Sequence, residues 1–213
     1  MSADAPLIVQ SDRTVLIEVN NPRYAAARNE LAHFAELEKS PEHIHTYRIT
    51  PLSIWNATAA GMGPDDMIGV LEDYGKFAVP GNLRHDIVDL AQRYGRLVLY
   101  AAENGMLTLA VDSLALARQV AAHPKVAPLL DSRRDDVHFA VAVKYRGEIK
   151  RVLTGLGFPV KDVAGYTEGA PLDIRLRETT RGDGPFVLRA YQEDAAENFY
   201  RGGGVDGGCG TIV

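Results

Sequence analysis

The chain has 213 residues, of which 46% are hydrophobic and 24% are charged, and it contains one cysteine. This composition is close to the globular average, which excludes collagen-like, low-complexity and wholly disordered chains. One thiol cannot form an internal disulfide, so a secreted disulfide scaffold is excluded and a reducing compartment is expected. No apolar run approaches the roughly 20 residues of a membrane span, and the start of the chain lacks signal-peptide features. We therefore expect a soluble, cytoplasmic protein without a membrane partner.

The formal net charge is −5, but the charge is unevenly distributed. Residues 1–94 hold 8 basic and 13 acidic side chains, residues 95–168 hold 10 and 8, and residues 169–213 hold 5 and 7. Only the middle segment is net basic. Phosphate contacts are therefore expected there rather than at either end.

Residues 1–94 predict a small helical domain with a few strands. β-rich runs at 7–9 and 14–19, separated by a polar turn, predict a hairpin. From Tyr24 onward apolar residues recur at helical spacing, which predicts a helix that ends at Ser40–Pro41. The later elements expected here are a strand over 45–50, a helix over 53–60, a helix that begins at Pro64, and a helix that Asn82 caps and Gly95 ends.

Residues 95–168 predict a compact α+β domain of about 70 residues, a size that can fold alone. Strands over 96–100 and 106–111 are joined across an Asn-Gly pair, which is a hairpin signal. The other elements expected here are a helix that Asp112–Ser113 caps, a strand over 139–143, and a helix over 144–156 that Gly157 ends.

Residues 169–213 begin with a stretch rich in Gly, Pro and charge, which predicts a linker with one strand over 172–176. A helix is expected after Leu188–Gln192, and Gly202–Gly204 ends it. Residues 210–213 have the character of a buried strand that is just beginning. We therefore expect the chain to be part of something longer.

Two histidines are candidate metal ligands. His43 and His45 lie on one side of a predicted strand, near Glu38. No C-x-x-C or H-E-x-x-H motif accompanies them, and Cys209 is far away in the sequence. A polar strand start is the simpler explanation, so no metal is expected; a metal or small-molecule enzyme built on these histidines is kept as an alternative. Nothing marks a nucleophile, so no catalytic residue is assigned.

A basic cluster is the best candidate for phosphate contacts, and its members are Lys144, Arg146, Lys150 and Arg151. Glu148 shares a helical face with Lys144 and Arg151 and cancels part of their charge, so a solvated surface explains the cluster equally well. The glycine-rich stretch 202–210 contains no lysine and therefore lacks the Walker A pattern that cradles nucleotide phosphates.

Taken together, the chain resembles the N-terminal part of bacterial XPB-type DNA repair helicases of superfamily 2. Each matching stretch is weak alone, but their order along the chain makes the match fairly specific. The stretches are Pro6–Asp12, Leu16–Val19, Phe34–Glu38, Pro41–Arg48, Thr50–Ala57, Tyr94–Leu97, Val126–Leu130 and Leu188–Gln192.

The resemblance implies three regions. Residues 1–94 would be the family's N-terminal domain, which docks repair protein partners. Residues 95–168 would be its damage-recognition domain, which contacts forked, mismatched or damaged DNA. Residues 169–213 would be a linker and the truncated start of the first RecA-like helicase domain, where Arg189 and Gln192 match the R-x-Y-Q element on the adenine side of the nucleotide.

The family's chemistry depends on groups that lie beyond this sequence. The resemblance implies ATP and Mg²⁺ as cofactors of an ATP-dependent 3′→5′ helicase of nucleotide excision repair. The chain stops before the Walker A loop, so we expect it to bind neither cofactor and to be inactive as an ATPase by itself. The leading hypothesis is a DNA-binding and regulatory region of such a helicase. The alternative is a protein-interaction module without DNA affinity of its own.

Overall fold

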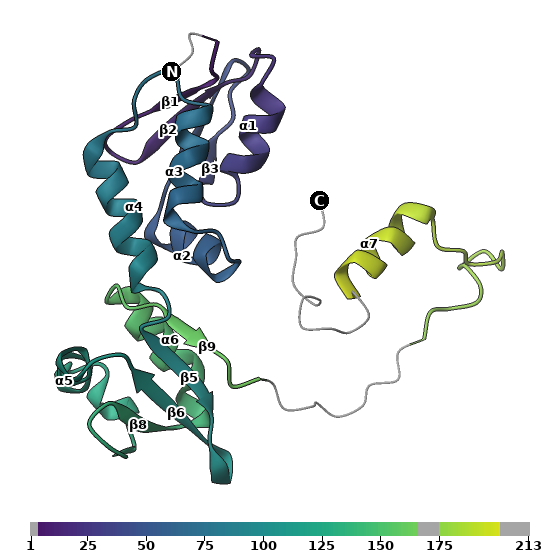
Figure 1. Ribbon diagram of the computed structural model, residues 1–213. Helices are drawn as coiled ribbons and strands as arrows, with labels where there is room; N and C mark the ends of the chain where they lie inside the picture. The colour runs from purple at the N-terminus through teal and green to yellow at the C-terminus, as the bar shows by residue number, and fades with distance from the viewer. Residues whose placement is uncertain (1–3, 166–174, 201–213) are drawn as a thin grey trace. The chain divides into compact units, whose positions relative to one another are not determined.

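The computed structural model describes residues 4–165 and 175–200, and within them it contains seven α-helices and two β-sheets (Figure 1). The chain divides into two compact units, Met1–Tyr166 and Thr167–Val213. Both sheets belong to the first unit. Because helices pack beside two sheets whose strands are mostly antiparallel, the α+β class predicted from the sequence is confirmed.

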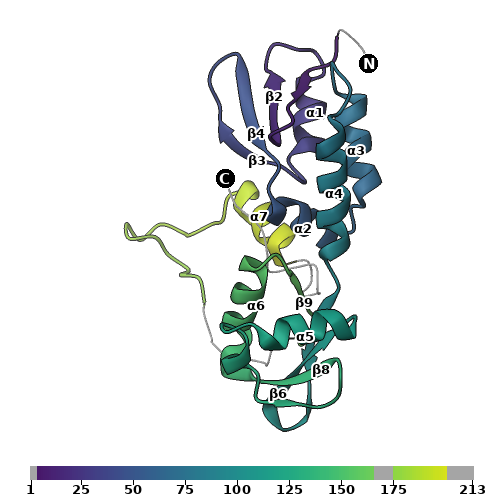
Figure 2. The same cartoon turned by 90° about the vertical axis from the view of Figure 1, so that its left-hand side faces the viewer.

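The first module, which we define as residues 4–94, contains a four-stranded antiparallel sheet in the order β1-β2-β4-β3. Its strands are β1 (Leu7–Val9), β2 (Thr14–Glu18), β3 (Glu36–Lys39) and β4 (Ile44–Arg48). Its helices are α1 (Tyr24–Leu31), α2 (Pro51–Ala59), α3 (Pro64–Asp73) and α4 (Gly81–Arg93). In Figure 2, α1, α3 and α4 lie on one side of the sheet.

The core of the first module forms because alternate strand residues and one stripe of each helix are apolar. The largest fully buried side chains in it are Leu7, Ile17, Leu31, Phe34, Ile49, Ile54, Met67, Leu71, Leu83 and Ile87. Burial of each contributes about 1.5–3 kcal/mol before entropic costs. Trp55 is also buried, and its indole Nε1 donates to the Leu90 carbonyl at 2.9 Å, which ties α2 to α4.

The second module, which we define as residues 95–165, contains a five-stranded sheet in the order β7-β8-β6-β5-β9. Its strands are β5 (Leu97–Ala101), β6 (Met106–Val111), β7 (Ser132–Arg133), β8 (His138–Ala142) and β9 (Val160–Asp162). Only the β5–β9 pair is parallel. The helices α5 (Leu114–Ala122) and α6 (Arg146–Gly155) share a second core with the strands, and no residue belongs to both cores.

In the second unit the described residues are 175–200. Thr179 and Pro185 form an isolated antiparallel bridge, and α7 (Ala190–Tyr200) follows. No residue of α7 is buried.

Several sequence predictions were wrong in detail. The helix predicted from Tyr24 to Ser40 ends at Leu31, because Glu36–Lys39 pairs with β4 and becomes an edge strand. All four of these residues are exposed, so no apolar alternation marked the strand. Asn82 does not cap a helix; α4 begins at Gly81, and the Asn82 amide donates to the Ser11 carbonyl instead.

The second module was predicted more closely. Ser113 caps α5 as expected, since its Oγ accepts from the Leu116 amide. The helix predicted from Lys144 starts two residues later, after a 3₁₀ turn at Val143–Tyr145. Strands β7 and β9 were missed because two or three residues give no period to recognise. The strand predicted over 172–176 falls mostly outside the described residues, and Arg175 and Leu176 are not in a strand; the strand predicted over 210–213 lies wholly outside them.

Candidate nucleic-acid interface

The predicted basic cluster divides into two pairs with different surroundings. Arg146 and Lys150 converge on Asp162 of β9. The Arg146 guanidinium donates to both carboxylate oxygens at 2.9 Å, and Lys150 Nζ donates to Oδ2 at 2.8 Å. Arg146 also donates to the Gly165 carbonyl. These two side chains therefore fasten the edge strand β9 to α6.

The carboxylate of Asp162 is held in its charged form. Its side chain is only 10% exposed, and burial by itself would raise its pKa. Hydrogen bonds from Arg146, Lys150 and the Ala164 amide outweigh burial and lower the pKa of Asp162 from 3.8 to about 2. The three side chains together thus keep a net charge of about +1, less than the +2 that the sequence suggested.

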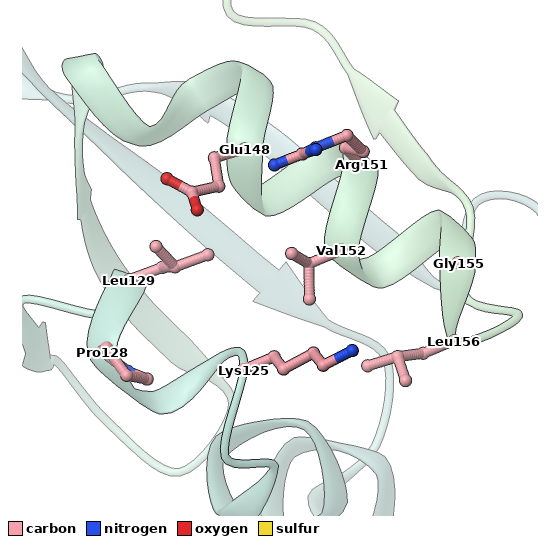
Figure 3. Close-up of a pocket in the computed structure, with 8 residues that line it drawn as sticks. All are labelled: Lys125, Pro128, Leu129, Glu148, Arg151, Val152, Gly155 and Leu156. Carbon is pink, nitrogen blue, oxygen red and sulfur yellow. The ribbon is translucent and has the colours of Figure 1, made fainter.

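Lys144 and Arg151 are exposed. Lys144 Nζ lies 4.8 Å from the centroid of the Tyr145 ring, which is a cation–π distance. Arg151 lines a hollow of about 540 Å³ between α6 and the 3₁₀ turn Ala127–Leu129 (Figure 3). Neither forms an ion pair with any of the described residues.

The hollow contains a cation that the sequence interpretation missed. In Figure 3, Lys125 and Arg151 lie on opposite sides of it, and the apolar side chains Leu129 and Val152 point between them. Lys125 is exposed and has no ion-pair partner within residues 4–165 and 175–200. Nothing in the sequence placed Lys125 beside α6, because the two are brought together only by the packing of the turn after α5 against α6.

Glu148 also lines this hollow. Figure 3 shows its carboxylate on the same side as Arg151, as the shared helical face predicted. It forms no ion pair in the described part of the chain. Two cations and one carboxylate leave the hollow net positive.

Arg189 and Gln192 are both exposed and lie at the start of α7. The Arg189 amide donates to Gln192 Oε1 at 3.0 Å, and the Gln192 amide donates to the Arg189 carbonyl at 2.8 Å. These bonds satisfy backbone groups at the helix N-terminus. The pair therefore has a local structural function here.

The two histidines considered as metal ligands are not part of a cluster. His45 Nδ1 is 2.9 Å from Tyr24 Oη, and the two rings meet edge to face. In the described ranges, 4–165 and 175–200, no three His, Cys, Asp or Glu side chains are grouped so that they could hold a metal. Cys209 lies outside these ranges. None of the helices in these ranges is long and apolar enough to span a membrane.

Comparison with known proteins identifies the family. A family model described as "Helicase conserved C-terminal domain" matches residues 7–135. The chain is 46% identical over 200 residues to the DNA 3′-5′ helicase XPB of Mycobacterium tuberculosis and 44% identical to that of Kineococcus radiotolerans. These matches cover 94% of this chain but 36% and 35% of the relatives, so the chain spans about a third of their length.

A more distant match lies in the general transcription and DNA repair factor IIH helicase/translocase subunit XPB/SSL2 of Saccharomyces cerevisiae. It is 33% identical over 103 residues, which cover 48% of this chain and 12% of that protein. The resemblance found in the sequence is confirmed: the chain belongs to the helicase family that this conserved domain defines, in the region that it shares with the XPB-type DNA helicases.

Proposed function

We propose that the chain is a DNA-contacting and regulatory region of an ATP-dependent 3′→5′ DNA helicase of nucleotide excision repair. The observation that carries this proposal is the pair of cations without ion-pair partners in the described residues, Lys125 and Arg151, on either side of one hollow in the only net-basic segment. Family membership supports the helicase assignment. Lys144 adds a third exposed cation in the 3₁₀ turn that precedes α6.

The four predicted DNA-binding residues take different functions in this proposal. Lys144 and Arg151, with Lys125, contact phosphates. Arg146 and Lys150 position β9 through Asp162 and contribute to the local field. In this proposal the second module contacts a forked, mismatched or damaged duplex.

We further propose three domains, residues 1–94, 95–168 and 169–213, with a repair protein partner docking on the first. The separate cores of the two modules support the boundary at residue 94. The protein-docking alternative is favoured by exposed apolar side chains around the edge strand β3. Leu37 and Ile44 are 53% and 43% exposed there.

The residues present do not complete a site for ATP and Mg²⁺. Arg189 and Gln192 could contact only the adenine side of a nucleotide, and no G-x-x-x-x-G-K-[ST] motif occurs in the 213 residues. ATP and Mg²⁺ supply the phosphoryl-transfer chemistry of such helicases when bound. We expect the 213-residue chain by itself to hydrolyse ATP at the background rate.

Fluorescence anisotropy with a forked, a mismatched and a plain duplex across a salt series tests the DNA assignment. Because each phosphate contact changes the log–log salt slope by about −0.9, three contacts predict a slope of roughly −2 to −4. The double substitution Lys125→Gln with Arg151→Gln should reduce that slope by about 2. The matched control, Arg28→Gln with Lys39→Gln, removes the same charge from the first module and should leave the slope unchanged.

The protein-docking alternative predicts that the chain has no DNA affinity of its own. If none of the three DNAs binds at low salt, the DNA assignment is wrong. If the chain then binds a protein partner and Leu37→Lys abolishes that binding, the first module is the protein-docking module.

A further inference from the structure

The sheet of the second module has a second face that its helices do not use. Strand residues alternate between faces, and Leu97, Leu99, Leu107, Leu109 and Val111 all belong to the core shared with α5 and α6. The residues between them take no part in that core. On the central strands they are Val98, Tyr100, Met106, Thr108, Ala110, His138, Ala140 and Ala142.

At the centre of this face Thr108 and Ala140 are buried, and two rings lie nearer its edges, the phenol of Tyr100 and the imidazole of His138. Ala110 and Ala140 have small side chains, and Tyr100, on β5 opposite Thr108, is half-exposed. Tyr100, Ala102 and Met106 line a hollow of about 560 Å³ together with Glu103 and Arg134. The half-exposed ring of Tyr100, beside Ala102 and Met106 in this hollow, offers a surface on which a planar group can stack.

Exposed cations lie at both edges of the same face. Arg134 follows β7, and its amide donates to the His138 carbonyl at 2.9 Å, which continues the strand pairing. Lys161 of β9 is paired with Val98 and so shares its face. Neither side chain forms an ion pair with a described residue. Four strand spacings separate the outer strands, about 19 Å, which is enough for several nucleotides.

Thr108, opposite Tyr100, carries a polar atom that lies beneath this face and lacks a partner among the described residues. It is 1% exposed, and its Oγ1 has no hydrogen-bond partner among the described residues. Such groups are rare in folded proteins because an unpaired buried hydroxyl is costly. Its neighbours on the face, Tyr100 opposite and Met106 two residues earlier, both line the hollow.

We infer that this sheet face binds an unpaired nucleobase of a DNA strand, with the Tyr100 ring stacked on the base and Arg134 on an adjacent phosphate. The inference rests on the proposed function, because it names what the second module recognises in forked or mismatched DNA. An aromatic platform is sequence-tolerant, since every base has a π-face. The Glu103 carboxylate at the rim disfavours a phosphate on its own side, so the backbone passes on the side of Arg134.

The test uses the full 213-residue chain and 2-aminopurine, a base whose fluorescence falls when it stacks. The probe stands in the centre of a 15-nucleotide single strand or as one unpaired base in a duplex. Binding should quench its emission in both. Tyr100→Ala should abolish the quenching and weaken single-strand binding at least about fivefold. Tyr100→Phe should retain both, and Tyr200→Ala, an exposed tyrosine on α7, is the matched control.

Arg134→Gln keeps the test informative if Tyr100→Ala does not fold. It should reduce the salt slope for the single strand by about 0.7 and leave the quenching in place. DNA binding without any quenching, or quenching that survives Tyr100→Ala, would overturn the base site and leave the proposed function standing. Failure of every DNA to bind at low salt would overturn both.

Discussion

Both modules of the first unit pack helices against a mostly antiparallel sheet, but they differ in the share of their positive charges that form ion pairs. In the first module five of the eight Lys and Arg side chains are in ion pairs: Arg13, Arg48, Lys76, Arg84 and Arg93. In the second module only four of ten are paired: Arg96, Arg133, Arg146 and Lys150. Unpaired cations therefore predict an anion-binding surface better than net charge does, because a paired cation must break its ion pair before it can bind an anion.

Each module has its own hydrophobic core, and a cavity made in each core is the change with the largest expected effect. Leu109→Ala in the second core and Leu71→Ala in the first should each lower the free energy of unfolding by about 2–5 kcal/mol, because both side chains are fully buried. Hydrogen exchange should show lost protection mainly in the module that carries the substitution. Equal loss of protection in both modules would mean that they unfold as one unit.

The next largest effect concerns the buried carboxylate that occupies two of the second module's cations. Asp162→Asn should lower the free energy of unfolding by roughly 2 kcal/mol at pH 7, because a pKa of about 2 against 3.8 represents stabilisation of the charged form. Since the pKa of the folded state lies below that of the unfolded state, this stabilisation is complete above about pH 5 and is lost as the pH falls toward 2. Urea denaturation at pH 7 and pH 3 measures both effects.

Asp112→Asn is the matched control for this experiment. Asp112 also has a lowered pKa, caused first by the hydrogen bond from Arg96, but the pair is exposed to solvent. Its substitution should cost less than about 1 kcal/mol. If Asp162→Asn lowered the free energy of unfolding by no more than this, the ion pairs between β9 and α6 would stabilise the fold no more than an exposed pair does.

The sequence was enough to predict the class of the fold and most of the longer elements. Periodicity and caps located α3 and α5, because Pro64 and Ser113 act locally. The sequence did not predict the secondary structure of segments whose conformation depends on a long-range contact. Glu36–Lys39 becomes a strand only because β4 lies beside it, and its exposed side chains carry no sign of this.

The candidate site was predicted in part for the same reason. Charge in the sequence identified the helix that carries Arg151, but it could not show that Asp162, eleven residues later, would occupy Arg146 and Lys150. Nor could it place Lys125 across the hollow from Arg151. Pairing of charges across a fold is a tertiary property, so a list of basic residues overstates how many of them are available to a ligand.

Two substitutions on α6 with smaller expected effects distinguish a residue that contacts DNA, Arg151, from a residue that positions β9, Arg146. Arg151→Gln should weaken binding to the forked duplex severalfold and reduce the salt slope by about 1, without changing thermal stability, because its side chain is exposed and unpaired among the described residues. Arg146→Gln should change DNA binding little but lower the melting temperature, because it leaves Asp162 with one partner fewer. Anisotropy and thermal denaturation of both variants would distinguish them, and identical behaviour would contradict the division.

The smallest expected difference compares a helix cap in each module. Thr50 Oγ1 accepts from the Ser53 amide at 3.0 Å, and Ser53 Oγ accepts in return from the Thr50 amide at 2.9 Å, so two backbone donors at the start of α2 are satisfied. Ser113 makes a single, longer bond of 3.4 Å to the Leu116 amide at the start of α5. Thr50→Ala should therefore cost about 1–2 kcal/mol and Ser113→Ala about 0.5 kcal/mol. Urea denaturation can resolve this difference, and a larger loss from Ser113→Ala would show that the α5 cap is stronger than its geometry indicates.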